Sequence, residues 1–108
     1  MARLDGAKMI EATLDLHGQT ENDAWAALQD FLPRQQAANK RLVLIITGKG
    51  KQDEQGRNIG LLYRLVPRWL TDGPLAARVD GFSEAAPEHG GAGALYVRLC
   101  RNNNARSA

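Results

Sequence analysis

The chain has 108 residues, which is enough for one globular domain with a hydrophobic core but too few for two. Hydrophobic residues make up 44% and charged residues 24%, as in ordinary water-soluble proteins. No apolar run approaches the roughly 20 residues that a membrane span requires, and the N-terminal residues lack the apolar core of a signal peptide. We therefore expect a cytoplasmic protein. Its single cysteine, Cys100, cannot form an internal disulfide or a cysteine-rich zinc site.

The net charge of +2 is distributed unevenly along the chain. Residues 1–39 contain three Lys or Arg and six Asp or Glu, whereas residues 40–108 contain eleven and six. The second part can therefore attract an anionic partner. A solvated surface of mixed charge accounts for the same numbers, so charge alone does not decide between the two interpretations.

The first third of the chain predicts a short strand followed by an amphipathic helix. Residues 1–12 show no hydrophobic period, and we expect them to form a flexible lead-in. Residues 12–17 alternate as in a strand. Thr20 is a suitable N-cap for the helix, and Pro33 should kink this helix or end its regular part. The apolar residues at helical spacing are Ala24, Trp25, Leu28, Phe31 and Leu32.

A second strand and a second helix follow. Residues 41–47 are almost entirely apolar, which is typical of a strand covered on most sides. Residues 48–58 are rich in glycine and charge and must form a loop. The helix after this loop ends at the Asp-Gly-Pro sequence of residues 72–74. Its apolar stripe consists of Ile59, Leu62, Leu65, Val66, Trp69 and Leu70.

The last third of the chain predicts two strands. Residues 76–82 have a weak strand pattern, residues 83–93 form a flexible loop, and residues 94–100 alternate almost perfectly. Residues 102–108 are polar and without period, so we expect a disordered tail.

The order β-α-β-α-β-β predicts an α/β two-layer sandwich in a single domain of residues 13–101. Two strand-helix-strand units imply parallel pairing with right-handed crossovers. The sheet then has four strands, and both helices cover one of its faces. We favour an antiparallel last strand, which makes the sheet mixed, although residues 83–93 are long enough for the last strand to return in either direction.

Polar side chains interrupt the first strand at its end. Leu14 and Leu16 should face the helices, so Asp15 and His17 should share the opposite face of the sheet. A carboxylate two residues from a histidine can fix its tautomer, raise its pKa or share a metal ion with it. A surface aspartate beside a histidine near a turn would produce the same triplet.

The last strand has a similar pattern. Its leucine and valine residues should face the helices, and Tyr96 and Arg98 should face outward on an open sheet surface. A phenol suits base stacking and a guanidinium suits phosphate contact. A solvated sheet face would carry such residues as well.

Two glycine-bearing loops adjoin strand ends. Residues 47–50, "TGKG", allow backbone N–H groups and Lys49 to approach an anion, although the spacing of a Walker loop is absent. Residues 89–93, "HGGAG", precede the last strand. Each loop alone could be a simple turn or connector. In an open α/β sheet with an antiparallel last strand, however, both loops and His17 would meet at one edge, where such sheets usually bind ligands.

Together, three motifs resemble the Smr (small MutS-related) domain over residues 13–101, and they look most like the stand-alone bacterial Smr-domain endonucleases. The motifs are "LDLHG" at 14–18, "TGKG" at 47–50 and "HGGAGALYVRL" at 89–99. The resemblance implies a β-α-β-α-β-β fold like the C-terminal domain of a bacterial translation initiation factor, with the last strand antiparallel. It also implies endonuclease activity on DNA or RNA, with Asp15 and His17 in the family's Asp-x-His motif.

The leading hypothesis is therefore a nucleic-acid endonuclease in which Asp15 orients His17 and His17 acts as general base or acid. No cofactor is certain, metal ligands are unknown, and Mg²⁺ held with the help of Asp15 stays open. We expect a monomer whose partner is DNA or RNA, with ribosome association as a further option and no membrane contact. The candidate nucleic-acid-binding residues are Thr47, Gly48, Lys49, Gly50, Lys51, Arg57, His89, Gly90, Gly91, Tyr96 and Arg98.

Two alternatives stay open. A non-catalytic module that binds nucleic acid or the ribosome would use the same basic residues but would not need His17 for affinity. A small-molecule phosphate-binding enzyme would need a deep pocket at the sheet edge, which a nucleic-acid site does not require.

Overall fold

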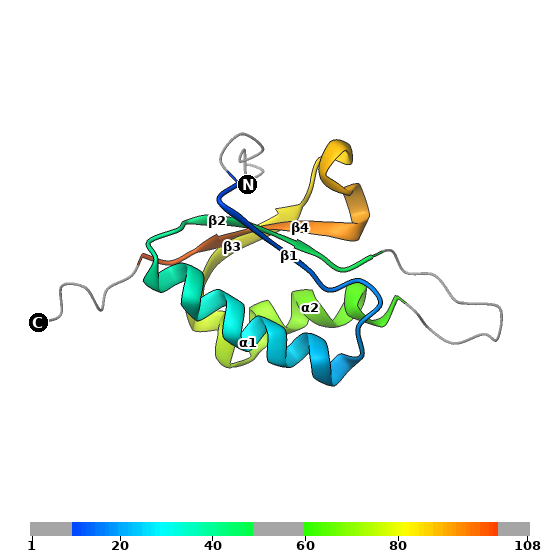
Figure 1. Ribbon diagram of the computed structural model, residues 1–108, viewed down its shortest axis with the longest axis horizontal. Helices are drawn as coiled ribbons and strands as arrows, with labels where there is room; N and C mark the ends of the chain where they lie inside the picture. Colours follow the sequence, from blue (N-terminus) through cyan, green and yellow to red (C-terminus); the bar gives the residue numbers. More distant parts are fainter. Residues whose placement is uncertain (1–9, 49–59, 102–108) are drawn as a thin grey trace, which may run out of the picture.

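The computed structural model describes residues 10–48 and 60–101. Its helices and strands form two layers, with the sheet above both helices in Figure 1. A short 3-10 helix, Pro74–Arg78, follows the second helix, and two single 3-10 turns, Pro87–His89 and Gly91–Gly93, precede the last strand. The elements in chain order are β1 (Ala12–Asp15), α1 (Glu21–Ala37), β2 (Leu42–Ile46), α2 (Leu61–Asp72), β3 (Val79–Glu84) and β4 (Ala94–Leu99).

The strands are ordered β1-β2-β4-β3 in one sheet. β1 is parallel to β2, and β4 lies antiparallel between β2 and β3. The predicted α/β two-layer sandwich, with a mixed sheet and an antiparallel last strand, is therefore confirmed. β3 begins later than the sequence pattern indicated, because residues 74–78 form the 3-10 helix instead of the start of the strand.

The main core lies between the helices and the sheet. Alternation along β4 places Val97 and Leu99 on the helix side, as predicted, and Leu16 at the end of β1 is fully buried on the same side. Each helix contributes one apolar stripe, and Trp25 of α1 meets Trp69 of α2 with ring centroids 5.1 Å apart. The fully buried side chains of this core are Leu16, Leu28, Leu32, Ile45, Leu99, Val43, Val66 and Val97.

The first helix begins as predicted but does not end at its proline. Thr20 Oγ1 accepts a hydrogen bond from the Asp23 N–H at 3.1 Å, so Thr20 caps the helix. Glu21 and Asp23 in the first turn are favourable for the helix dipole. Pro33 lies inside the helix, which continues to Ala37. The proline removes one N–H donor but its neighbours keep the helical path.

The opposite face of the sheet is not open, which corrects the prediction for Tyr96. A second apolar cluster covers this face, and Tyr96 is only 3% exposed within it. The chain after β3 folds back over Tyr96 of β4. The Tyr96 hydroxyl accepts a hydrogen bond from Ala86 N at 3.1 Å and lies 3.0 Å from His89 Nδ1. Tyr96 points to the predicted face, but it cannot stack on a base.

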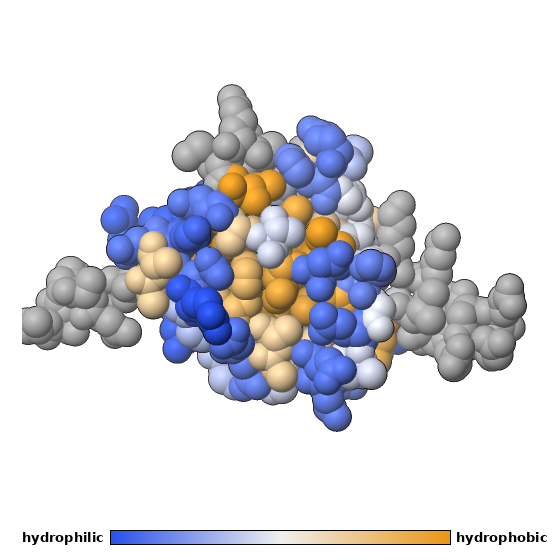
Figure 2. Space-filling model, viewed as in Figure 1, coloured by the Kyte–Doolittle hydropathy of each residue, from blue (hydrophilic) through white to orange (hydrophobic). Residues whose placement is uncertain are grey.

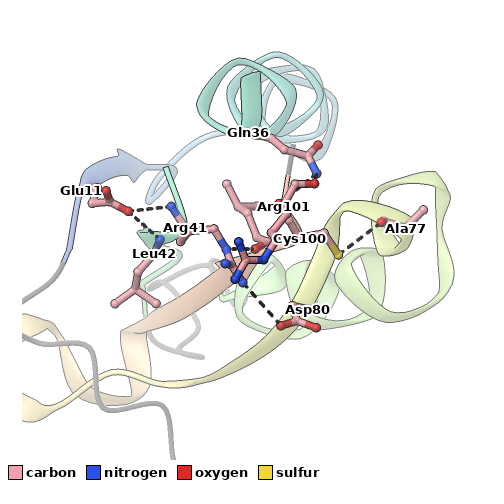
Figure 3. A network of polar contacts seen from close by, with 9 residues as sticks. Glu11, Gln36, Arg41, Leu42, Ala77, Asp80, Cys100 and Arg101 are labelled. Carbon is pink, nitrogen blue, oxygen red and sulfur yellow. Dashed lines mark hydrogen bonds and ion pairs between the residues drawn. The ribbon is translucent and has the colours of Figure 1, made fainter. Parts of the chain in front are cut away.

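The edge where β2 begins and β4 ends is tied by polar contacts (Figure 3). The Glu11 carboxylate accepts hydrogen bonds from Arg41 N at 2.6 Å and Leu42 N at 3.1 Å. These two N–H groups lower the pKa of Glu11 below its ordinary value. The Arg41 guanidinium donates to the Leu99 carbonyl at 2.8 Å and approaches Asp80 at 3.9 Å. The two backbone N–H groups and the Arg41 guanidinium are thus occupied by internal acceptors.

Apolar residues gather in the middle of the face seen in Figure 2, and hydrophilic residues surround them. The centre of this face therefore lacks the basic groups that phosphate contacts require. In the part of the chain that the structure describes, no helix has both the length and the apolar character needed to cross a membrane.

The core predicts a large effect for Leu28→Ala. Leu28 is fully buried between α1 and the sheet, so its truncation leaves a cavity and should lower the free energy of unfolding by about 2–5 kcal/mol. The neighbouring Gln29 is exposed, and Gln29→Ala should change stability by less than about 0.5 kcal/mol. Urea denaturation of both variants measures the difference; a loss below about 1 kcal/mol for Leu28→Ala would contradict this packing.

Candidate functional site

Three segments distant in the sequence meet where β1 and β2 end and β4 begins. The Gly93 carbonyl accepts hydrogen bonds from the N–H groups of Thr47 at 2.8 Å and Gly48 at 3.0 Å. A Cβ atom added to Gly48 would lie 3.4 Å from the His17 Cβ, so the end of β2 also adjoins the end of β1. The predicted convergence is confirmed for the described residues. We call this edge, formed by residues 15–18, 47–48 and 89–93, the rim.

Glycines permit the tight backbone at the rim. Gly48 has a φ of +82°, which an L-residue adopts only with strain. Gly90 has a φ of +118°, and a Cβ atom added there would lie only 2.9 Å from the Ala94 Cβ. A side chain at Gly90 would therefore separate this turn from the start of β4.

The Asp15/His17 pair lies exposed on the rim. His17 Nδ1 lies 3.0 Å from Asp15 Oδ1, and the His17 backbone N–H donates to the same oxygen at 3.0 Å. The side chains are 69% exposed for His17 and 52% exposed for Asp15. The His17 Nε2 atom makes no hydrogen bond within the described part of the chain. The pair thus fixes one ring nitrogen and presents the other to solvent.

The charge of Asp15 determines the tautomer of His17. The side-chain hydrogen bond from His17, followed by the hydrogen bond from its backbone N–H, lowers the pKa of Asp15. An ionised carboxylate only accepts hydrogen bonds, so Nδ1 must carry the proton. In a neutral imidazole the exposed Nε2 is then the unprotonated, basic nitrogen.

The backbone amides of the glycine loops are already used within the protein. Thr47 and Gly48 donate to Gly93, and Gly90 and Gly91 donate to carbonyls of residues 87 and 86. This corrects the prediction of anion binding for these four amides, because each has an internal acceptor; the amides of Lys49 and Gly50 lie outside the described residues. The N–H of Gly18, beside His17, has no hydrogen-bond partner among the described residues, and the space around its Cα is open.

His89 and Arg98 do not join the Asp15/His17 pair. His89 is half-buried, and its contact with the Tyr96 hydroxyl ties the turn before β4 to the strand. Arg98 is exposed but pairs with Leu42 at the start of β2, whereas Ala94 pairs with Ile46 at the rim. Four residues of strand separate Arg98 from the rim by about 13 Å. Arg98 therefore lies too far from His17 to belong to the same group of side chains, and its predicted contact with nucleic acid stays a prediction.

The remaining predicted phosphate contacts lie outside the described residues. They are Lys49, Gly50, Lys51 and Arg57. Within residues 10–48 and 60–101, no group of three or more His, Cys, Asp or Glu is arranged to hold a metal ion.

A pocket of about 390 Å³ opens at the same edge of the sheet and was not predicted from the sequence. α2 forms one side of it with Tyr63 and Arg64, and Glu84 at the end of β3 lies across from them. Tyr63 is the large hydrophobic residue exposed most in the described part, at 41%. The sequence signal that could have revealed this pocket is Tyr63, an aromatic residue outside the apolar stripe of α2. The lining residues are Thr47, Tyr63, Arg64, Pro67, Glu84, Ala92 and Leu95.

Comparison with known proteins agrees with this geometry. Residues 14–100 match the family model of the Smr domain. The chain belongs to the Smr domain family. It is 36% identical to the probable DNA endonuclease SmrA of Escherichia coli K12 over 96 aligned residues, and the alignment covers 89% of this chain. The chain spans 49% of the length of that relative.

Two crystal structures of Smr proteins have the same fold. The Smr domain of Thermus thermophilus MutS2 superimposes with a TM-score of 0.68 at 26% identity, covering 83% of this chain and 99% of that chain. YdaL, a stand-alone small MutS-related protein of Escherichia coli, gives a TM-score of 0.69 at 34% identity and covers 90% of this chain and 73% of that chain. The resemblance of this Smr domain to stand-alone members, predicted from its motifs, is confirmed.

The hydrogen bonds of the Asp15/His17 pair predict a measurable titration. The pKa of Asp15 should lie below its ordinary value and should rise in His17→Ala, while the backbone N–H keeps part of the shift. Because the folded-state pKa is lowered, this contribution to stability is present above the unfolded pKa near about 4 and is lost as the pH falls through the folded pKa.

Carboxyl ¹³C NMR measures this titration directly. The pKa of Glu11, lowered by contacts at the opposite edge, should not change in His17→Ala and provides an internal control. An Asp15 pKa that is the same in both proteins would show that the pair does not form in solution.

The turn before β4 predicts unequal effects of two similar substitutions. Ala at either Gly90 or Gly91 introduces a side chain at positive φ, which costs about 1–2 kcal/mol. Only Gly90→Ala adds the 2.9 Å Cβ contact, since nothing lies within 4 Å of a Cβ at Gly91. Urea denaturation should show a clearly larger loss for Gly90→Ala. Equal losses would mean that the turn does not pack on Ala94.

Proposed function

We propose that this Smr domain is a nucleic-acid endonuclease whose reacting group is His17. The observation that carries the proposal is the solvent-exposed imidazole whose Nδ1 is bound by an ionised aspartate and whose Nε2 has no partner among the described residues. The relative SmrA is a probable DNA endonuclease, which supports the same class of reaction.

The pair supplies the parts of general acid–base catalysis. His17 Nε2 accepts the proton of the attacking oxygen, which is a water molecule for DNA or a ribose 2′-hydroxyl for RNA, as that oxygen forms its bond to phosphorus. The bond from phosphorus to the leaving oxygen breaks, this oxygen takes up a proton from water, and the imidazolium then returns its proton to the solvent. Asp15 stabilises the imidazolium that forms, as a carboxylate does in other histidine-containing sites.

The phosphate needs a donor near the imidazole. The Gly18 N–H is adjacent to His17 along the chain and has no acceptor within the described residues, so it can donate to a phosphate oxygen. The open space around Gly18 allows this approach. Lys49 follows Gly48 in the sequence, and we propose that it adds the positive charge that the described rim lacks.

The described side chains by themselves supply too few ligands for a tight metal site. Asp15 and His17 are two ligands, and the described residues contain no third carboxylate, histidine or cysteine arranged with them. Mg²⁺ usually joins one or two carboxylates to substrate phosphates and keeps several waters. The proposed reaction therefore includes no step through a metal, and the cleavage assay is run with and without EDTA.

Cleavage assays on supercoiled DNA, single-stranded DNA and RNA test the role of His17. His17→Ala should reduce the cleavage rate by about 10²–10⁴-fold, the contribution typical of a general base. Asp15→Asn should reduce the rate less, because it keeps the geometry but removes the charge. Asp80→Asn is the matched control, since Asp80 is 54% exposed, like Asp15, but lies at the opposite edge of the sheet.

The outcomes separate the proposal from its alternatives. Wild-type cutting that persists in His17→Ala would refute the assigned role. Salt-sensitive binding without cleavage by the wild type would instead support a non-catalytic nucleic-acid-binding or ribosome-binding module.

A further inference from the structure

We infer that the pocket beside the rim binds one unpaired guanine base of the nucleic acid that the rim cleaves. This inference rests on the proposed function for the identity of the ligand as nucleic acid, and it extends that function to a substrate preference. The pocket contains an aromatic ring, a cation and a carboxylate, from Tyr63, Arg64 and Glu84, and none of them takes part in the proposed cleavage step.

The pocket and the Asp15/His17 pair lie along the same edge of the sheet. Thr47 lines the pocket, and the next residue, Gly48, lies against His17. Thr47 is 3% exposed, and its N–H is held by the Gly93 carbonyl, so this connection is rigid. The strand order places His17 on the β1 side and the pocket on the side of β4 and β3. A strand lying along the rim can thus place a phosphate at His17 and a nearby base in the pocket.

The α2 side of the pocket suits a base and its phosphate. Tyr63 is exposed and its ring can stack on a base, an interaction that aromatic side chains commonly make with unpaired nucleotides. Arg64 follows on the same side, and it makes no ion pair or hydrogen bond within the described residues. An unoccupied guanidinium beside an exposed ring is suited to a flanking phosphate.

Glu84 decides which base fits. Its carboxylate has no hydrogen bond or ion pair among the described residues, although Arg64 lines the same pocket. A carboxylate accepts two parallel hydrogen bonds, and guanine offers two adjacent donors, N1–H and the N2 amino group, on its Watson–Crick edge. Adenine and cytosine each present a donor next to an acceptor, and thymine and uracil place N3–H between two carbonyls. Guanine is therefore the base that matches Glu84.

The same carboxylate argues against other ligands. Arg64 and Glu84 both line the pocket, so their charges offset each other and leave no net positive charge to attract a free phosphate, even though the volume would allow one. A guanine within a duplex has its Watson–Crick edge paired with cytosine. The pocket therefore selects single-stranded or locally opened nucleic acid.

Fluorescence anisotropy with ten-nucleotide single strands tests the preference, in DNA and in RNA. Each labelled strand contains one central guanine, adenine or cytosine in a background of thymine or uracil, and His17→Ala prevents cleavage during the measurement. The guanine strand should bind about tenfold more tightly than the others, and Tyr63→Ala should weaken its binding by about tenfold. Equal affinities for all strands would overturn the inference.

Glu84→Gln provides the sharper test. A glutamine amide presents one acceptor and one donor, a pair that every base can match, including guanine through N1–H and O6. The preference for guanine should therefore be lost. Glu88→Gln is the matched control, because Glu88 is exposed on the turn before β4 and does not line the pocket. If both substitutions changed the base preference equally, the change would come from the lost negative charge alone, which would contradict a contact between Glu84 and the base.

Cleavage and binding measurements together distinguish a failure of the guanine site from a failure of the proposed endonuclease. Cleavage that depends on His17, together with equal affinity for all bases, would overturn only the guanine site. A guanine preference that depends on Glu84, without cleavage, would leave the pocket in place and refute the endonuclease. Guanosine monophosphate is included as a competitor. Binding of this nucleotide as tight as that of the strand would identify a small-molecule site and overturn the nucleic-acid assignment.

Discussion

The Gly93 carbonyl, through the hydrogen bonds that it accepts, is the contact on which the rim depends. It receives the N–H groups of Thr47 and Gly48, and the Thr47 hydroxyl lies 3.3 Å from it. The end of β2 is thereby fixed to the start of β4, and Gly48 is held against His17. One acceptor thus joins the second and third motifs, and the Leu16 N–H, which donates to the Ile46 carbonyl at 2.7 Å, ties the first motif to the same place. The glycines serve mainly to bring the backbone together, while His17 and the pocket residues face the ligand.

The two faces of the sheet have different tasks in this arrangement. The face of the sheet that packs on the helices holds the main core. The pocket opens beside this core, between α2, the end of β3 and the start of β4. The opposite face is closed by the chain that follows β3, with the Tyr96 hydroxyl holding both Ala86 and His89. The turn that supplies Gly93 is therefore anchored from behind. Polar and aromatic groups that look functional in the sequence, such as Tyr96, support the rim without contacting a ligand.

The sequence predicted the fold and the meeting of the motifs because both follow from local rules. Alternation in β4 and apolar spacing in the helices define the elements, and chain order then defines which strand ends share an edge. Alternation could not show that residues 85–93 cover the outer face, so the exposure of Tyr96 was wrong. The position of Arg98 away from the rim follows from the antiparallel register of β4 on β2, which pairs Arg98 with Leu42. The pocket depends on the distance between α2 and the end of β3, which no sequence pattern encodes.

Nucleic acid is proposed to lie along the rim, with its phosphate at His17 and a base in the pocket. Amide chemical-shift mapping by NMR during titration with a guanine-containing single strand tests this most directly. The largest changes should occur at Gly18, Gly48, Tyr63 and Glu84. Changes concentrated instead around Arg41, Asp80 and Arg101, at the opposite edge of the sheet shown in Figure 3, would contradict it.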